Sequence, residues 1–211
     1  MDRSRPTPTT ALLAALLLTG LATGAGPARA DAPGNPPTAA GPAAGPATAP
    51  PTVADPAVHD ALVAALRQAQ VDSPNAPARH ICYATHVAFI GWQKPVCDGR
   101  PNGTEGQSRA IQAIDIIATN TGGVCADANV QSIGWQGWRC GDDGTDILVG
   151  TTGQSLQMEA LAVSIATNGI CADAYVQDHG WLGFQCAAAK QVAVAGTTGQ
   201  GLRMEAVEIV V

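Results

Sequence analysis

Aromatic and charged residues are scarce in this sequence, making up 4% and 13% of its 211 residues. Lys and Arg number 11 against 17 Asp and Glu, which gives a formal net charge of −6. Binding to a phosphate backbone or to an anionic membrane depends on a basic face. The composition therefore argues against nucleic acid and membrane surfaces as partners.

Motifs for catalysis and for metal binding are also missing. The sequence contains no Gly-x-Ser-x-Gly, no His-Glu-x-x-His and no closely spaced pairs of Cys or His that would hold zinc. Residues 142–146 resemble part of a calcium loop, but they lack the downstream Glu and are expected to form an acidic hairpin loop. We therefore predict no enzyme active site, no metal site and no cofactor.

The first 30 residues have the organisation of a secretory signal peptide. Arg3 and Arg5 give a basic start, residues 11–22 are almost entirely small and apolar, and residues 28–30 read Ala-Arg-Ala, a cleavage pattern. A membrane anchor is the alternative, but it would need about 20 apolar residues. Cleavage after residue 30 would release a soluble secreted protein, and the loss of three Arg and one Asp would change the net charge from −6 to −8.

A linker and a short helix are expected to follow. Residues 31–54 are rich in Pro, Ala and Gly and offer too little apolar surface to fold. A helix is predicted over residues 55–70, because Asp55 can cap it, Pro56 suits its first turn and an apolar face follows. That face consists of Val58, Leu62, Ala65 and Leu66. We expect the helix to dock on the next domain or to fray in solvent, with a partner-binding helix as the alternative; residues 73–77 mark the boundary.

Residues 80–211 consist of three copies of one unit, at 80–119, 120–165 and 166–211. Each copy has a cysteine, a Gly-Trp pair nine positions later, a second cysteine 15 positions after the first, a glycine turn of the Gly-Thr-Thr-Gly-Gln type and a closing apolar run. A unit of this size is too small to bury its own apolar face. The three copies are therefore expected to share one core.

Four short strands are predicted in each copy, which gives an all-β body of about twelve strands. Residues 124–130 alternate apolar and polar side chains, as a strand with one buried face does.

The closing apolar run of copies two and three has its large apolar residues at spacings of two, three and two positions. One extra residue near Glu159 and Ala160, and near Glu205 and Ala206, would keep them all on the core side. We therefore predict a β-bulge in every copy, with a strand buried on both faces as the alternative.

Two three-fold architectures accommodate these strands. In the first, three sheets pack as the faces of a prism; in the second, a trefoil barrel carries a hairpin cap. We favour the β-prism-like arrangement and keep the β-trefoil-like arrangement as the alternative.

The six cysteines allow fifteen disulfide pairings. Only two of these patterns treat the copies alike, namely pairing within each copy or pairing of each copy with the next. We favour pairing within each copy, because a cysteine on each of two strands joined by a turn brings the sulfurs to bridging distance. The expected bridges are Cys82 with Cys97, Cys125 with Cys140 and Cys171 with Cys186.

The repeated features resemble a known family. An alternating strand, Gly-Trp-Gln at residues 91–93 and 134–136, the glycine turn and a Met-Glu-Ala closing strand are similar to the clostridial hydrophobic repeat, ChW. The resemblance covers all three copies and implies a secreted or surface-associated bacterial protein whose repeats mediate adhesion or bind proteins or glycans. Gln112 stands where the other copies have Glu159 and Glu205, Leu182 follows the third Gly-Trp, and the cysteine pairs are an addition to the usual repeat.

Residues that all copies share are expected to build the fold. Trp92, Trp135 and Trp181 each follow a glycine, and we predict them to be core aromatics. The glycine-rich segments lack the Lys of a phosphate loop, so we expect turns with glycine at positive φ.

Candidate binding residues are outward positions that differ between the copies. A flat aromatic ring beside amide and carboxylate groups suits a sugar ring or a peptide. Copy one has Ala84, His86, Ala88 and Pro95 at these places and is expected to lack a site. The candidates are Asp127, Asn129, Gln131 and Trp138 in copy two, and Asp173, Tyr175, Gln177 and Phe184 in copy three.

From these residues we expect a secreted, non-catalytic module that binds a glycan or a cell-surface polymer. An extracellular protein-binding module, such as a protease inhibitor, or a structural surface protein is the alternative. The candidate residues can also be the solvated face of a sheet, since alternation alone places polar residues outside. The sequence does not predict the oligomeric state.

Overall fold

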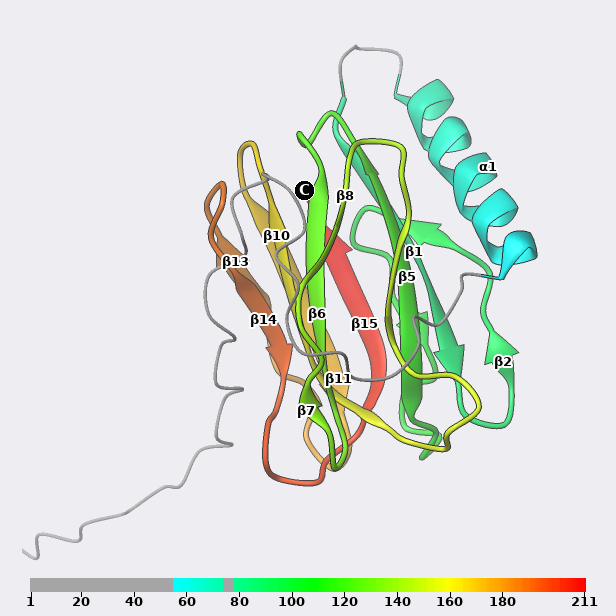
Figure 1. Ribbon diagram of the computed structural model, residues 1–211, viewed down its shortest axis with the longest axis vertical. Coiled ribbons are helices and arrows are strands. Elements are labelled where there is room, and N and C mark those ends of the chain that lie inside the picture. The colour runs from blue at the N-terminus through cyan, green and yellow to red at the C-terminus, as the bar shows by residue number, and fades with distance from the viewer. Residues whose placement is uncertain (1–54, 74–77) are drawn as a thin grey trace, which may run out of the picture.

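The computed structural model describes residues 55–73 and 78–211, which form one helix and fifteen short strands (Figure 1). The predicted signal peptide, the whole of the predicted linker and most of the predicted boundary segment lie outside the described residues. The strands form three antiparallel sheets of five strands each, so the all-β repeat class is confirmed. Each copy contributes five strands instead of the four predicted, because the Gly-Trp pair forms a two-residue strand of its own.

Each sheet is built around two long central strands. Sheet 1 contains β1 (His80–Val87), β2 (Gly91–Trp92), β3 (Val96–Cys97), β5 (Ile111–Thr119) and β9 (Ile147–Gly150). Sheet 2 contains β6 (Val124–Val130), β7 (Gly134–Trp135), β8 (Arg139–Gly141), β10 (Met158–Ile165) and β14 (Ala193–Gly196). Sheet 3 contains β11 (Ile170–Val176), β12 (Gly180–Trp181), β13 (Gln185–Ala187), β15 (Met204–Val210) and β4 (Asn102–Gly103).

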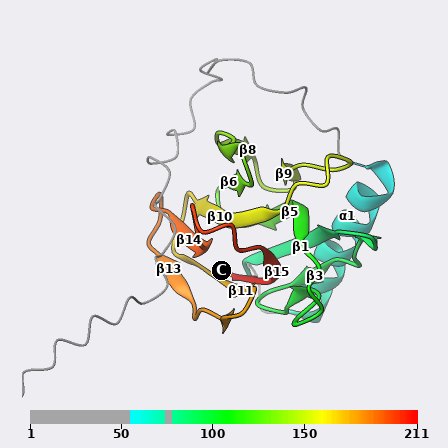
Figure 2. The ribbon, with the colours of Figure 1, turned by 90° about the horizontal axis from the view of Figure 1, so that it is seen from below.

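The inner faces of the three sheets share one hydrophobic core. Ile114 of β5, Leu161 of β10 and Val207 of β15 are fully buried in the same cluster, together with apolar residues of β1, β6 and β11. Seen along the strands, the three groups of strands surround a common centre (Figure 2). Tyr83 of β1 closes the ring between copies one and three: its buried hydroxyl donates to the Arg100 carbonyl and accepts from the Ile209 amide at 2.9 Å.

One strand of each sheet comes from another copy, which the sequence did not predict. β9 of copy two pairs with β5 of copy one, and β14 of copy three pairs with β10 of copy two. β4 of copy one pairs with β15 of copy three and completes the cycle. Each copy therefore completes the sheet of a neighbour, and the core is held by backbone hydrogen bonds between copies as well as by side-chain packing.

The predicted bulges are confirmed in all three copies, and they form the junctions between copies. The register shifts by one residue at Gln112, Glu159 and Glu205. The carbonyl oxygens of these residues accept amide hydrogen bonds of 2.7 to 2.8 Å from the exchanged copy's turn. The donors are Thr151, Thr197 and Thr104, respectively.

The glycine before each of these threonines has a positive φ and no room for a side chain. Gly150 has φ of 92°, and a Cβ added there would lie 2.5 Å from the Gln112 carbonyl oxygen. Gly196 and Gly103 face the carbonyls of Glu159 and Glu205 in the same way. The first glycine of the repeated turn is therefore required by close approach of two backbones as well as by its own φ.

All three disulfides join cysteines of the same copy, which confirms the predicted pairing. Each bridge links directly opposite residues of neighbouring strands, and the Cα atoms are 4.0 to 4.1 Å apart. No free cysteine remains. The bridges lie on the side of the sheets opposite to the common core, because the residues before and after each first cysteine point into that core.

Helix α1 (Pro56–Asp72) packs against the outside of sheet 1 (Figure 1). The Asp55 side chain caps its first turn by accepting from the Ala57 amide at 2.9 Å. Val58, Leu62 and Leu66 of the helix are buried against an apolar patch of the sheet. That patch consists of Cys82, Ala84 and Ile117, with Trp92 and Cys97 at its margin.

We predict that G150A destabilises the protein much more than G153A. Gly153 also has a positive φ, 72°, but a Cβ there meets no atom within 4 Å. G153A should therefore cost about 1 kcal/mol from backbone strain alone, whereas G150A should cost at least about 3 kcal/mol because the bulge must also move. The free energies of unfolding are measured by guanidinium titration, and equal losses would show that the close approach at Gly150 is unimportant.

We also predict that the Cys82–Cys97 bridge stabilises the protein more than the Cys125–Cys140 bridge. Each closes a 15-residue separation, for which chain entropy alone gives about 3 kcal/mol. The fully buried Cys82 also packs under α1, whereas Cys140 is exposed. C82A/C97A should therefore lose more free energy of unfolding than C125A/C140A, measured without reductant; the reverse order would contradict the packing role.

Candidate functional site

The outer faces of the sheets carry the candidate residues, because alternate residues of β1, β6 and β11 point away from the core. The outward residues of β6 are Cys125, Asp127 and Asn129. Those of β11 are Cys171, Asp173 and Tyr175. On β1 the corresponding residues are Cys82, Ala84 and His86.

The outer face of sheet 1 is occupied by α1. Ala84 and Ile117, which are apolar at outward positions, are fully buried beneath the helix. The equivalents of Ala84 are Asp127 and Asp173, and a carboxylate there would be buried under the helix without a partner. The apolar residues that copy one has at these positions therefore allow α1 to pack on sheet 1. The part of the sheet beneath α1 is covered by the helix and is not open to a ligand.

The three tryptophans are not in the common core, so the prediction that they are core aromatics is wrong. β2, β7 and β12 lie at sheet edges and pair with the ends of β1, β6 and β11. In these pairs Trp92, Trp135 and Trp181 lie opposite the outward residues His86, Asn129 and Tyr175, and directly opposite residues share a face. All three tryptophans are half-buried.

On the outer face of sheet 2, Asp127 supports a loop. Its exposed fraction is 2%, and its carboxylate accepts the Gly137 amide at 3.0 Å, between β7 and β8. Burial raises the pKa of Asp127, and this hydrogen bond opposes the shift. Asn129 is also buried, while Gln131 and Trp138 are half-buried at the ends of β6 and β8. The polar residues of this face are thus less accessible than the sequence predicted, and Trp135 and Trp138 supply its aromatic surface.

On the outer face of sheet 3, an aromatic pair is the main feature. The rings of Tyr175 and Trp181 meet edge to face, with centroids 5.7 Å apart and planes at 87°. Phe184, just before β13, is 46% exposed. Gln177 binds Arg203 Nη1 at 2.8 Å and also contacts Asp178. The structure thus brings Tyr175 and Trp181 together, and only Tyr175 of the two was a candidate from the sequence.

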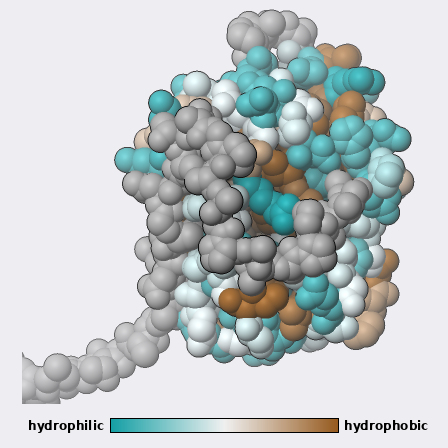
Figure 3. Space-filling model, in the orientation of Figure 1, coloured by the Kyte–Doolittle hydropathy of each residue, from teal (hydrophilic) through white to brown (hydrophobic). Residues whose placement is uncertain are grey.

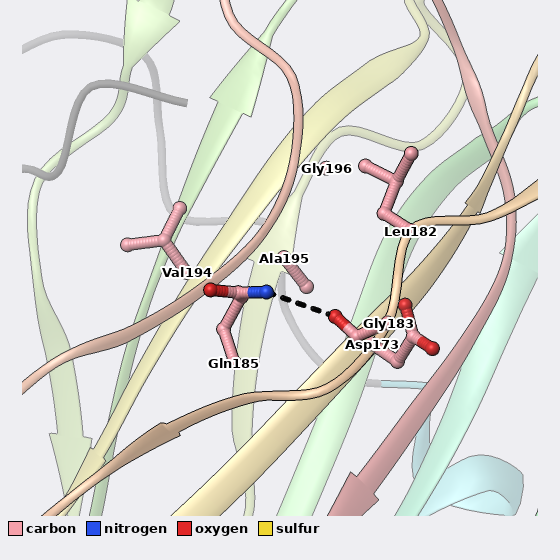
Figure 4. A pocket seen from close by; sticks show the side chains of 7 residues that line it. All are labelled: Asp173, Leu182, Gly183, Gln185, Val194, Ala195 and Gly196. Carbon is pink, nitrogen blue, oxygen red and sulfur yellow. Dashed lines mark hydrogen bonds between the residues drawn. The ribbon is translucent and has the colours of Figure 1, made fainter. Parts of the chain in front are cut away.

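A small pocket lies between sheet 3 and β14 (Figure 4). Asp173, Leu182, Gln185 and Val194 line it, and Gln185 Nε2 donates to the Gly183 carbonyl at 3.0 Å beside it. Its volume is about 20 Å³, which is enough for about one water molecule. This pocket cannot enclose a sugar ring or a peptide side chain, so the aromatic surfaces are the better candidates for ligand contact.

The molecule's surface on the side of β6 and α1 is a mosaic of hydrophilic and hydrophobic residues (Figure 3). At the β1–β2 turn, Phe89 is 98% exposed and its neighbour Ile90 is 48% exposed. Phe89 has φ of 66°, while the equivalent positions of copies two and three hold Ser132 and Asp178 at similar φ. A bulky residue is rare in this left-handed region, so copy one carries an exposed and strained apolar tip that the sequence reasoning missed.

A buried acidic group lies under the N-terminal part of α1. Asp115 of β5 has no exposed surface, and burial raises its pKa to about 7, with the nearby Asp146 carboxylate adding to the shift. Asp146 Oδ1 forms a hydrogen bond of 2.9 Å with His59 Nδ1 of the helix. This hydrogen bond in turn raises the pKa of His59. The His59–Asp146 hydrogen bond ties the helix to the loop before β9, while both carboxylate oxygens of Asp115 are buried without a hydrogen-bond partner of their own among the described residues.

The acidic loop at residues 142–146 has a structural function at Asp143. Its carboxylate accepts the amides of Thr121, Gly122 and Gly123 at 3.0 to 3.2 Å, and the Thr121 hydroxyl at 2.9 Å. Partial burial favours a higher pKa for Asp143, but these donors hold the pKa below its usual value. Among the described residues, no group of three or more His, Cys, Asp or Glu is placed to hold a metal ion.

Comparison with known proteins gives one match. A family model described as Clostridial hydrophobic W matches residues 86–120, 129–166 and 175–211. No curated protein and no solved structure matches the chain. In the part of the chain that the structure describes, no helix combines the length and hydrophobicity that crossing a membrane requires. The three disulfides indicate an oxidising environment.

We predict that D115N removes a pH dependence of stability. Because the pKa of Asp115 is raised to about 7 in the folded state, the folded protein keeps a proton that the unfolded chain loses. The stabilisation is present at low pH and is lost as the pH rises through about 7. The free energy of unfolding of D115N should therefore increase relative to wild type between about pH 5 and about pH 8; a constant difference across this range would contradict the shift.

Proposed function

Since the chain belongs to the Clostridial hydrophobic W repeat family, we propose that it is a secreted, non-catalytic module that binds a glycan or a cell-surface polymer. Secretion is supported by the signal-peptide pattern of residues 1–30 and by the three disulfides. We also propose a β-prism-like architecture, which is supported by three separate sheets whose inner faces share one core.

The observation that carries the proposal is the set of aromatic side chains on the outer faces of sheets 2 and 3. Trp135 is in β7 of sheet 2, and Trp138 directly precedes β8 of that sheet. Tyr175 and Trp181 are in β11 and β12 of sheet 3, and Phe184 directly precedes β13. All five are half-buried or exposed. Aromatic rings supply a flat apolar surface with a polar edge, which suits the apolar face of a sugar. Neighbouring amide and carboxylate groups can fix a sugar's hydroxyls.

The scaffold behind these faces is well suited to surface recognition. Each disulfide links the two strands that carry or flank the aromatic residues, and the bulge junctions hold the strands in register. Ligand contacts on a rigid surface lose less entropy on binding than contacts made by mobile side chains. Two such faces on one body would also allow one polymer chain to be bound at two points.

The proposal predicts that aromatic residues of the outer faces, and not every exposed aromatic, determine retention on polysaccharides. W138A, W181A and F184A should each lower retention in a glycan array and an insoluble-polysaccharide pull-down by about tenfold, the effect of one aromatic contact of roughly 1–1.5 kcal/mol. F89A, which removes the exposed aromatic of the β1–β2 turn, is the matched control and should retain wild-type binding. Equal behaviour of all four variants would contradict the proposal.

The apolar tip at Phe89 and Ile90 supports a second candidate, binding of an extracellular protein. An exposed apolar pair in a strained turn is a known kind of interaction feature, and the equivalent turns carry Ser132 and Asp178 instead. If wild type binds no glycan but captures a protein that F89A does not, the protein-binding function replaces the first proposal.

A further inference from the structure

The exchange of strands brings an acidic residue of copy one onto the outer face of sheet 3. Glu105 lies in the turn after β4, which pairs with β15. The Trp181 indole N–H donates to Glu105 Oε2 at 3.4 Å. The next residue, Gly106, is so close to Tyr175 that an added Cβ would lie 3.4 Å from its hydroxyl. The turn of copy one and the aromatic pair of copy three therefore form one surface.

Two further carboxylates belong to this surface. Asp173 of β11 and Glu208 of β15 are directly opposite each other in the sheet. Glu208 is half-buried, whereas Asp173 is 5% exposed and accepts the Ala174 amide at 2.7 Å, so Asp173 acts on a ligand through its charge and not by direct contact. Burial raises the pKa of Glu208, and the negative charges of Asp173 and Glu105 add to the shift. The three carboxylates are therefore close enough to repel one another beside the aromatic pair.

Among the described residues, no ion pair joins a basic side chain to these carboxylates. The ion pairs among the described residues are His59–Asp146, His80–Asp98 and Arg203–Glu205. Arg203, which directly precedes β15, binds Glu205 at 2.9 Å and Gln177 at 2.8 Å. The aromatic surface of sheet 3 thus has an uncompensated negative charge in a protein that is acidic overall.

This combination occurs in one copy only. Copies two and three have Thr152 and Thr198 in the turn position that Glu105 occupies in copy one. Where sheet 3 has Tyr175 and Glu208, sheet 2 has Asn129 and Ala162. The corresponding face of sheet 1 is covered by α1. Sheet 1 has an edge-to-face pair at the same positions, His86 with Trp92, whose centroids are 5.3 Å apart. The negative charge beside the Tyr175–Trp181 pair is therefore what is specific to sheet 3, and the repeat fold does not require it.

From this juxtaposition we propose that the outer face of sheet 3 binds a cationic glycan, an amino-sugar polymer whose amino groups are not acetylated. An ammonium group is attracted to the faces of Trp and Tyr rings and forms strong hydrogen bonds with carboxylates. The sugar ring that carries it contacts the aromatic pair. The inference rests on the proposed function, and it assigns to that function a ligand class and a site.

The test compares two soluble oligosaccharides that differ only in acetylation, a hexamer of glucosamine and a hexamer of N-acetylglucosamine, by isothermal titration calorimetry. Wild type should bind the glucosamine hexamer about tenfold more tightly, and salt should weaken this binding. E105T should abolish most of the preference. Because E105T introduces the residue that copies two and three carry at the same turn position, it should fold normally, which circular dichroism checks.

D142T is the matched control, since it also replaces an exposed acidic residue by threonine, in the hairpin loop before β9. It should bind both hexamers as wild type does. If wild type binds the hexamers equally, or if E105T and D142T lower the affinity alike, the site and its selectivity for cations are wrong. If penta-lysine binds wild type as tightly as the glucosamine hexamer does, and E105T weakens its binding too, the site binds cations but the assignment to a glycan is wrong.

The two proposals can fail separately. Retention of neutral polysaccharides that W138A or F184A reduces, without any preference for the glucosamine hexamer, would overturn this inference and leave the proposed function in place. Loss of binding to every glycan tested would overturn both.

Discussion

The structure depends on one backbone hydrogen bond that is made three times. In each case a threonine amide of the repeated turn donates to the carbonyl of a bulged residue in another copy. The bulge turns that carbonyl out of the regular ladder, and the glycine before the threonine lets the two backbones approach. Sheet register, copy order and core geometry follow from these contacts, because each one closes a sheet with a strand from a different copy.

The sequence predicted the local features of this arrangement well. The two-three-two spacing of Leu156, Met158, Leu161 and Val163 located the bulge, because only an extra residue keeps such a set on one side. The constant cysteine separation predicted the disulfides. The exchange of strands was not predictable in this way, since a strand of two to four residues pairs equally well with a neighbour of its own copy or of another.

The candidate surface was predicted in part. Alternation correctly placed Asp127 and Asp173 on the outer faces, but it does not show that both are almost completely buried. The tryptophans were wrongly assigned to the core because the prediction used the average burial of tryptophan in proteins. In this fold, the position of each tryptophan in its strand determines which face of the sheet it lies on. Pairing of the short Gly-Trp strands opposite outward residues moves these rings to the outside. The role of Glu105 required the three-dimensional structure, since it lies 76 residues from Trp181 in the chain.

The pairing of β4 with β15 has a consequence for biosynthesis. In this pairing Ala206 of β15 lies opposite Gly103 of β4, which is 103 residues earlier in the sequence (206 − 103), so β4 is synthesised long before its partner. The ring of sheets therefore stays open until β15 has been synthesised, and among the described strand pairs the pairing that closes it is the most distant in the sequence, which favours slow folding. Until β4 pairs with it, β15 has one unpaired edge, and such an edge can pair with a strand of another chain.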